Sequence, residues 1–548
     1  MNSFTHSISP TATIMRHLIS STFASPFLFF LLFSIFVVSQ VDVGHSVTDT
    51  FHEGEYVGLV WHMAAYYAGN ASFPLIIHGG MDFIPSLLAK FVYGDDRVIV
   101  GTRVINSLIV IVTWSFFLDL CWRMASKPKE YTAWIAIPII FILLASRQFE
   151  SAVDLHHAFI GPRDLFLILT LWSLVSYEQC LNDKARVSYV ALITMASTFG
   201  IYWSYDRGIM ALLSYTAFAF SLLHRNFKFD AALSIVTAIA MLVIMEYSKL
   251  AGSIFDVLSN ILHWIRNGSE IWQDYNLHPI STAPFMLPFA LVALIPLVLY
   301  AVKDDLIKNK SPLIIVVALL IVIEIILIKT IFNRPGLPRS TWGLWPLIVL
   351  LIYGGSRFFH PSPKDTSFSQ PQLKQISPLL VFIFPAFILS LTTLHYYHIY
   401  SPPRLSLFNA FVDNARYSKR DINIVSGDIK KISEAMALSK PSCAFGWTNE
   451  GVIPLLARLP LCTKFSYAIY SSNNYQSNII NELSLINPSA LVFDTPNWSI
   501  KIDDKPMSDR LPYVFDFILK KYPHEVRMGA YTLRTQSIIN SIPLHTIK

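Results

Sequence analysis

Acidic and histidine side chains crowd into the segment that directly follows the first apolar run of the chain. Residues 42–56 read DVGHSVTDTFHEGEY, and Asp49, His52, Glu53 and Glu55 all fall within seven residues of one another. Carboxylates beside a bilayer are costly unless they have a partner or a function. A carboxylate that is placed next to a hydroxyl can take its proton as a general base. The segment therefore predicts a catalytic site, with the three acids as catalytic candidates and His52 as a substrate-binding candidate.

Polar residues of the same kinds recur later in the chain, mostly within a few residues of a predicted helix end. They lie in the motifs IIHGGMDFIP, RQFESAVDLHHAFIGPRD, YWSYDRG and FNRPGLPRSTW. Helix ends on one side of a membrane lie at a common depth, so we expect these side chains to converge near one membrane surface. The candidate substrate-binding residues in these motifs are His78, Asp82, Asp154, His156, Arg163, Asp206, Arg207, Arg334 and Arg339.

This set of side chains suits phosphate chemistry. Arginines that make bidentate contacts can hold a phosphate or diphosphate leaving group. The acids could instead bind a divalent cation, such as Mg or Mn, that neutralises the same group. Structural explanations stay open as well: Asp206-Arg207 fits a solvated loop, Asp164 is favourable at a helix start, and His156-His157 fits an ordinary loop.

Composition places the chain among polytopic membrane proteins. It has 548 residues, of which 53% are hydrophobic and 14% are charged, and its mean hydropathy is +0.48. A soluble protein carries about 25% charged residues. The net charge of +6 is small for this length, and Lys and Arg mostly flank apolar runs. We interpret that charge as a topology signal rather than a nucleic-acid-binding surface.

Apolar runs of about 20 residues, the length that crosses a bilayer, recur along the chain. They predict a mainly α fold, a polytopic transmembrane bundle of about eleven helices. The predicted spans are 23–41, 98–118, 132–146, 164–181, 187–203, 209–224, 231–250, 284–302, 312–331, 341–354 and 377–397.

Basic residues in the short loops set the orientation. They fall on one side of the predicted bundle, which we assign to the cytoplasm together with the N-terminus. An odd number of helices then puts residues 401–548 outside the cytoplasm. The first apolar run lacks an A-x-A cleavage site and is long for a signal peptide, which favours an uncleaved signal-anchor. The topogenic residues include Arg16, Arg123, Lys127, Lys129, Lys184, Arg186, Arg225, Lys228, Lys303, Lys308, Lys310, Arg357, Lys364 and Lys374.

The C-terminal region differs in character from the rest. Its charges are denser and its apolar runs are short, so we divide the chain into a membrane module, 1–400, and a small extracytoplasmic α/β domain, 401–548. ALVFD (490–494) predicts a buried strand, and DRLPYVFDFILKKY (509–522) predicts an amphipathic helix. Cys443 and Cys462 share this region, where a disulfide is chemically allowed and two buried thiols are the alternative.

This layout resembles the GT-C superfamily of polytopic glycosyltransferases, which use polyprenyl-phosphate-linked sugar donors. The matching stretches are TDTFHEGEY in the first outer loop, and CAFGWTNEGVIPLLARLPLCTKF followed by INPSALVFD, which resemble outer domains of bacterial members. The resemblance implies that Asp49 is the catalytic base, with Glu53 and Glu55 as fallbacks. The chain offers acid-x-acid only as Glu53-Gly54-Glu55, which leaves the metal requirement open. It also lacks the W-W-D signature of oligosaccharyl transferases, which argues against transfer to protein asparagine.

We therefore predict an inverting hexosyl- or pentosyltransferase in a bacterial inner membrane. It would move a sugar from a polyprenyl-phosphate donor to a glycan, lipid or protein acceptor at the outer face, with no nucleic-acid partner. Asp49 would deprotonate the acceptor hydroxyl, whose oxygen then attacks the anomeric carbon opposite the phosphate. Arg207, Arg334 and Arg339, and next Arg163, would hold the phosphate. The residues expected to orient sugar or acceptor are His52, His78 and Asp82.

Other classes of protein remain as alternatives. A polysaccharide polymerase or ligase typically has its large outer loop between late helices, whereas the long loops here are early (42–97) and C-terminal. A transporter or flippase should place ionisable residues near the bilayer centre, and the candidates are Glu246, Lys249, Glu324 and Lys329. HEGE is not the HExxH motif of zinc proteases, so we set a metallopeptidase aside.

Overall fold

The structure is a computed structural model, and it positions most of the predicted elements. Three predicted spans, 132–146, 284–302 and 377–397, lie outside the residues that it describes. The described residues are 26–39, 43, 48–125, 160–271, 313–333, 345–359, 420–448, 450–471, 473–494, 501–502 and 505–538.

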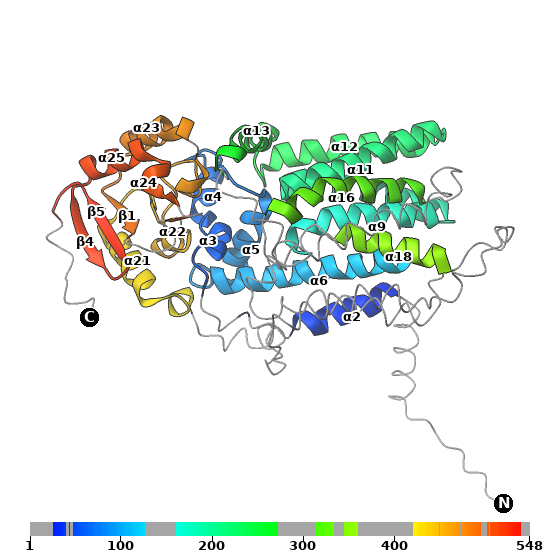
Figure 1. The fold of residues 1–548 in the computed structure, drawn as a ribbon, viewed down its shortest axis with the longest axis horizontal. Helices are drawn as coiled ribbons and strands as arrows, with labels where there is room; N and C mark the ends of the chain where they lie inside the picture. Colours follow the sequence, from blue (N-terminus) through cyan, green and yellow to red (C-terminus); the bar gives the residue numbers. More distant parts are fainter. Residues whose placement is uncertain are drawn as a thin grey trace, which may run out of the picture.

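Long helices lie side by side and form one half of the molecule (Figure 1). Every predicted span that falls on described residues is helical, with boundaries within several residues of the prediction. The helices are α2 (Pro26–Val38), α6 (Val98–Met124), α9 (Leu165–Gln179), α10 (Asp183–Trp203), α11 (Tyr205–His224), α12 (Lys228–Ser248), α16 (Ile314–Asn333) and α18 (Trp345–Phe359).

Two of the described helices, α6 and α12, are long and apolar enough to cross a membrane. Shorter apolar stretches occupy Pro26–Val38, Ile314–Leu327 and Trp345–Gly354. The two long helices differ in their surroundings: 72% of the apolar window of α6 is buried inside the protein, against 22% for α12. Helix α12 therefore lies at the edge of the bundle, with most of its apolar surface uncovered by protein.

Several small hydroxyl side chains fit inside this apolar bundle because they donate to the backbone of their own helix. In α6, the hydroxyls of Thr102, Ser107, Thr113 and Ser115 donate to the carbonyl four residues earlier, at 2.6–2.8 Å. Such bonds to the helix's own backbone remove the cost of burying an unpaired hydroxyl. These four buried hydroxyl groups therefore have hydrogen-bond partners although they lie in an apolar interior.

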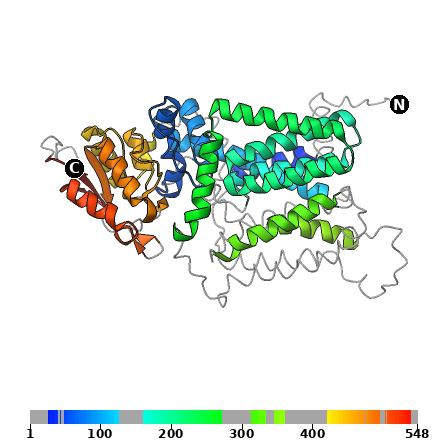
Figure 2. The same cartoon turned by 90° about the horizontal axis from the view of Figure 1, so that it is seen from above.

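The polar segment after α2 folds into short helices at one end of the bundle. They are α3 (His52–Val57), α4 (Val60–Tyr67) and α5 (Ile84–Tyr93), with a 3-10 turn at Gly80–Asp82. A further helix, α13 (Ile254–Ile271), lies at the same end. It is seen nearly end-on in Figure 1 and lengthwise in Figure 2, so it runs across the direction of the long helices.

The C-terminal region contains a three-stranded sheet in the order β1-β5-β4, formed by Ala490–Asp494, Tyr531–Thr535 and His524–Met528. All its strand pairs are antiparallel, for example Val492 opposite Leu533. The sheet is therefore that of an α+β domain, which corrects the expected α/β class, since α/β sheets are mostly parallel. The helices of this region are α21 (Gly427–Ser439), α22 (Val452–Ala457), α23 (Gln476–Ile486), α24 (Met507–Arg510) and α25 (Pro512–Lys521).

The two predicted elements of this region are present. Strand β1 spans the predicted 490–494. The predicted helix 509–522 is divided, because α24 ends at Arg510 and α25 begins at Pro512. Proline suits the first position of a helix and is a poor continuation of the preceding one. The buried side of α25 is as expected, with Val514 and Ile518 at no more than 1% exposure.

The C-terminal region packs tightly against the short helices of the first outer segment. A Cβ atom on Gly451, at the start of α22, would lie 2.1 Å from the carbonyl oxygen of Gly54 in α3. A Cβ on Gly58 would likewise meet the Gly451 backbone. Apolar side chains from both parts, including Val57 and Val452, belong to one buried cluster. Any residue larger than glycine at these contacts would force the two parts of the chain apart.

Candidate active site

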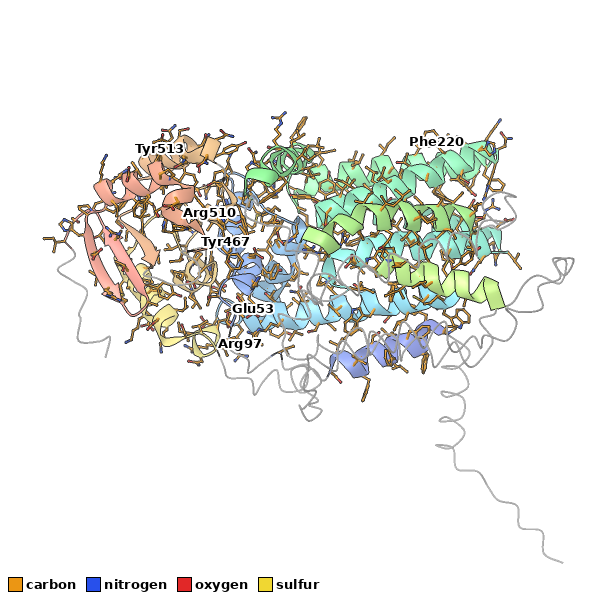
Figure 3. All side chains as sticks on the ribbon, viewed as in Figure 1. Glu53, Arg97, Phe220, Tyr467, Arg510 and Tyr513 are labelled. Carbon is orange, nitrogen blue, oxygen red and sulfur yellow. A yellow bond between two sulfur atoms is a disulfide. The ribbon has the colours of Figure 1, made fainter. Side chains whose placement is uncertain are left out.

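Residues from four separate segments meet where the C-terminal region contacts the bundle. The segments are α3 with the loop before α5, the starts of α9 and α11, and the turn that ends at Tyr470. Figure 3 labels Glu53 and Tyr467 on either side of this junction. The predicted residues found here are Asp49, His52, Glu53, Glu55, His78, Asp82, Arg163, Asp206 and Arg207.

Asp49 is held by the first turn of α3. Its Oδ1 accepts from the backbone N–H groups of Phe51 and His52, at 3.1 and 2.9 Å, and its Oδ2 accepts from Nδ1 of His52 at 2.8 Å. This is the arrangement of a helix-capping aspartate. Burial raises the pKa of Asp49, but the hydrogen bonds and charge of His52 outweigh burial, so the pKa lies below its usual value. Both oxygens are therefore engaged, and the carboxylate is a weak base.

Glu53 is buried in an ion pair with an arginine that the sequence did not single out. Its Oε1 accepts from Nε of Arg103 at 2.5 Å, and its Oε2 accepts from Nη2 of Arg103 at 2.8 Å. Oε2 also accepts from the backbone N–H of Asp49 at 2.9 Å. Arg103 donates further to the carbonyl of Val43 at 3.2 Å. The Glu53–Arg103 ion pair thus joins α3 to α6, which is a structural role.

Glu55 points to a different side of α3, because residues two apart on a helix do not share a face. The buried hydroxyl of Tyr470, from the C-terminal region, donates to Oε1 of Glu55. The Tyr470 ring is stacked on that of Tyr467 at a centroid distance of 5.4 Å. Burial raises the pKa of Glu55 above its usual value, although His78 and the Tyr470 hydrogen bond act to lower it. A partly buried acid with a raised pKa is the type of group that serves as a base near neutral pH.

His78 and Asp82 form a second acid–imidazole pair next to Glu55. Nδ1 of His78 lies 2.9 Å from Oδ1 of Asp82, whose Oδ2 accepts the backbone N–H of His78 at 2.9 Å. The following residue, Gly79, has a φ of 119° and packs against the carbonyl of Trp203 at the end of α10. A side chain there would be strained and would collide with that carbonyl. The glycine therefore lets the loop approach the bundle closely enough to present His78.

Two arginines complete the cluster, and they differ in burial and in their acidic partners. Arg207 is 2% exposed, and its Nε donates to Oδ1 of Asp164 at 2.7 Å. Arg163 lies 3.9 Å from Oδ2 of Asp206, beyond hydrogen-bond length, and that carboxylate is 45% exposed. The charges of Arg207 and Arg163, with a hydrogen bond from Ser204, hold the pKa of Asp206 well below its usual value. The nearby start of α18 joins the same network, because Nε1 of Trp345 donates to Asp164.

The predicted acid-x-acid pair does not come together as a chelating site. Glu53 is engaged by Arg103 and Glu55 by Tyr470. Within the part of the chain that the structure describes, no group of three His, Cys, Asp or Glu side chains is placed to hold a metal ion. The described residues therefore give no fit for Mg or Mn, and no step below uses a metal.

Some predicted residues fall outside the description, and some important ones were not predicted. Asp154, His156, Arg334 and Arg339 lie outside the described residues. Arg103 was missed because it lies inside an apolar run, and Tyr470 because it is 415 residues from its partner. The hydrogen bonds of Asp49, by contrast, are local, because the backbone donors on Phe51 and His52 lie two and three residues after it.

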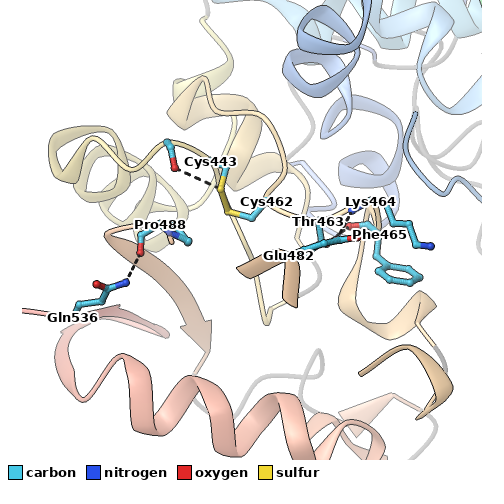
Figure 4. Close-up of a disulfide and its surroundings, with 9 residues drawn as sticks. Cys443, Cys462, Thr463, Lys464, Phe465, Glu482, Pro488 and Gln536 are labelled. Atoms are coloured by element: carbon cyan, nitrogen blue, oxygen red, sulfur yellow. Dashed lines mark hydrogen bonds between the residues drawn. A yellow bond between two sulfur atoms is a disulfide. The ribbon is translucent and has the colours of Figure 1, made fainter. Parts of the chain in front are cut away.

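Cys443 and Cys462 form a disulfide beside strand β1 (Figure 4). It closes a loop with a sequence separation of 19, and both cysteines are buried. A cross-link of this loop length stabilises a fold by about 3 kcal/mol, mainly by restricting the unfolded chain. The loop includes α22, which contacts α3, so the cross-link also supports the contact between the C-terminal region and the short helices of the first outer segment.

We expect the double substitution Cys443→Ser/Cys462→Ser to lower the free energy of unfolding of the C-terminal region by about 3 kcal/mol. Limited proteolysis of the full-length protein over a urea gradient would measure the change. Cys180→Ser, which removes a free cysteine far from this region, is the control. Equal protease resistance of the double variant and the control would contradict the expectation.

No family model matches the chain, and no curated protein sequence matches it. Several solved structures are similar to it, among them the following two. One is an oligosaccharyltransferase from Archaeoglobus fulgidus in complex with Zn and sulfate, which matches over 86% of this chain and 68% of its own, with 10% identity and a TM-score of 0.45. The other is ArnT from Cupriavidus metallidurans bound to undecaprenyl phosphate, which matches over 94% of this chain and 98% of its own, with 12% identity and a TM-score of 0.45.

Proposed function

We propose that this protein is an integral membrane glycosyltransferase that moves a sugar from a polyprenyl-phosphate donor to an acceptor hydroxyl at the outer membrane face. The observation that carries the proposal is the meeting of Glu55, His78–Asp82 and Arg163–Asp206 at one end of a bundle of apolar helices. A base, a polar pair and a cation are the groups that transfer from a sugar phosphate needs. The sequence resemblance to the GT-C superfamily agrees with this class.

Glu55 is the base in this proposal, in preference to Asp49. Its pKa is raised by burial, whereas the pKa of Asp49 is lowered and both Asp49 oxygens accept hydrogen bonds. Glu55 would take the proton of the acceptor hydroxyl as that oxygen attacks the anomeric carbon. The bond from that carbon to the phosphate oxygen breaks on the opposite face, which inverts the configuration and releases the lipid phosphate.

Arg163 is the phosphate ligand that the geometry supports best. Its guanidinium lies 3.9 Å from the Asp206 carboxylate, which is 45% exposed, so a phosphate that enters from the exposed side could bind next to it. Arg207 is fixed against Asp164 in full burial, and its role would be to support the start of α11. His78, oriented by Asp82 through Nδ1, would hydrogen-bond a sugar or acceptor hydroxyl through Nε2.

The membrane location in this proposal rests on α6 and α12 and on the apolar composition of the chain. The N-terminus would be cytoplasmic and the region 401–548 outside, so that the cluster faces the outer surface. A polyprenyl chain would stay in the bilayer while its phosphate reaches the bundle end. The donor enters from the membrane and the acceptor from the aqueous side.

The transport alternative depended most on Glu324, in the interior of α16. Glu324 is 1% exposed, and its Oε2 accepts from the backbone N–H of Leu347 in the first turn of α18, at 3.2 Å. A carboxylate suits a helix N-terminus, where N–H groups lack partners. One oxygen of Glu324 therefore joins two helices, whereas Oε1 is buried without a hydrogen-bond partner among the described residues, so this contact alone does not decide against a transport role.

The direct test uses membranes that contain the wild-type protein or the variant Arg163→Gln, supplied with radiolabelled polyprenyl-phosphate sugars. The proposal expects wild type to release free lipid phosphate and to move label into an acceptor. The variant should raise the KM for the donor about tenfold or more, because a charged phosphate contact is worth about 1.5–3 kcal/mol. Release of lipid phosphate by neither protein, with every donor tried and the protein folded, would refute the proposal.

Tyr470→Phe should change the pH dependence of transfer. The Tyr470 hydroxyl donates to the ionised carboxylate of Glu55, so its removal raises the pKa of Glu55 further. A base works only when it is deprotonated, so the acidic limb of the kcat/KM profile should move to higher pH and activity near its midpoint should fall. Tyr513→Phe, at an exposed position of α25, is the matched control. An unshifted acidic limb in Tyr470→Phe would exclude this role for Tyr470.

A further inference from the structure

Helix α13 presents an apolar stripe to its surroundings instead of to the protein core. Phe255, Leu258, Leu262 and Ile265 are 77%, 48%, 45% and 70% exposed. Their spacings of three, four and three residues put them on one face of the helix. Four large apolar side chains in a row at this exposure are unusual on a surface that faces water.

The face of α13 that is buried in the protein contains Val257, at 1% exposure, together with three polar residues. Asn260, His263 and Asn267 are 5%, 5% and 7% exposed. Nδ2 of Asn260 donates to the carbonyl of Pro74 at 3.2 Å, and Nε2 of His263 lies 3.3 Å from the carbonyl oxygen of Tyr470. A surface helix of a soluble protein has the reverse pattern, with its apolar stripe inward. The inversion has a physical explanation if the exposed face meets hydrocarbon.

The direction and the neighbours of α13 point to the same environment. Figures 1 and 2 together place it across the direction of the long helices, at the bundle end that carries the site. It follows α12 after a short turn, and α12 is an apolar helix with Ile239 and Val243 at 57% and 61% exposure. The helix that carries the exposed apolar stripe therefore directly follows, along the chain, a helix that is able to cross a membrane and has most of its own apolar surface uncovered.

We propose that α13 lies in the plane of the outer membrane interface, with its apolar stripe among the upper acyl chains of the lipid. An interfacial helix has this composition, an apolar face in the lipid and polar groups on the other side. Arg266 is exposed next to Ile265, where its guanidinium can reach lipid phosphates while its stem covers apolar surface. This inference rests on the proposed membrane location and does not depend on the transfer chemistry.

This placement would set the height of the site relative to the lipid. Besides the contact of His263 with Tyr470, Nε1 of Trp264 donates to the carbonyl of Ile76 at 2.8 Å. Tyr470 is the hydrogen-bond partner of Glu55, and Ile76 is two residues before His78. Helix α13 thus contacts the residue that bonds Glu55 and the loop that carries His78. The reacting phosphate of a membrane lipid would then meet the site at the depth of its own headgroup.

Spin labels measure this depth directly. Single cysteines at Leu258, Leu262 and Ile265 would be labelled in full-length protein that carries Cys121→Ala and Cys180→Ser and keeps its disulfide. The protein would be reconstituted into vesicles of phosphatidylethanolamine and phosphatidylglycerol. Accessibility to oxygen, which partitions into lipid, would be compared with accessibility to a water-soluble nickel chelate. Labels at Val243 on α12 and Tyr513 on α25 give the lipid and water references.

We expect the α13 labels to be more accessible to oxygen than to nickel, at a depth between the two references. Water accessibility equal to that of Tyr513, with Val243 in lipid, would overturn the inference and leave the membrane location intact. Water accessibility at Val243 as well would refute the membrane location itself. Shielding of the α13 labels from both reagents would mean that a protein, such as a second copy, covers the stripe, and would also overturn the inference.

Discussion

The substitution Glu55→Gln should lower kcat for sugar transfer by a factor on the order of 10²–10⁴, the usual contribution of a general base. Glutamine keeps the size of the side chain, and its amide oxygen still accepts from Tyr470, so the packing of α3 against the C-terminal region should survive. What is lost is the proton acceptor. The KM for the lipid donor should change little, because the proposed phosphate ligand is Arg163 rather than Glu55.

Two comparison variants serve as controls for Glu55→Gln. Asp49→Asn removes the charge that pairs with His52 but keeps a side-chain oxygen that can accept from the backbone N–H groups at the start of α3, so it should reduce activity only modestly. Glu434→Gln, at an exposed position of α21, makes the same chemical change away from the site and should be silent. If Asp49→Asn were inactive while Glu55→Gln kept full activity, the base would be Asp49, as the family resemblance implies.

The sequence predicts those elements whose evidence lies within their own residues. The long helices were predictable because an apolar run of sufficient length carries its own evidence, as for α6 and α12. Strand β1 was predictable for the same reason, since ALVFD is a short apolar run that ends in a polar residue. The short helices α3 to α5 were not, because segments of six to ten residues are stable only through packing.

The candidate site shows the same division. The sequence placed the acids in the right segment, but their roles depend on distant partners. Arg103 lies 50 residues from Glu53, and Tyr470 lies 415 residues from Glu55. No local sequence pattern shows that Glu53 contacts an arginine whereas Glu55, two residues later, contacts a tyrosine. The three-dimensional contacts are what distinguish a structural Glu53 from a catalytic candidate at Glu55.

The largest stability effect should come from Arg103→Met. The Arg103 and Glu53 side chains are 3% and 8% exposed, so removing the arginine leaves a buried carboxylate without its counter-charge. Breaking one partner of such a pair costs about 3–5 kcal/mol. Thermal unfolding in lipid nanodiscs should detect a drop of several degrees or more. Arg458→Met breaks the ion pair with Asp96, in which both side chains are about half exposed, and should cost about 0–1 kcal/mol.

The double variant Glu53→Gln/Arg103→Met separates structure from chemistry. It replaces the buried charges with neutral side chains of similar size, so most of the lost stability should return. Activity should return with it, because Glu55 sits on the same helix, α3, and needs only that the helix be held in place. A double variant that is stable but inactive would instead assign Glu53 a part in the reaction. Stability and activity that recover together would show that the ion pair serves to position Glu55.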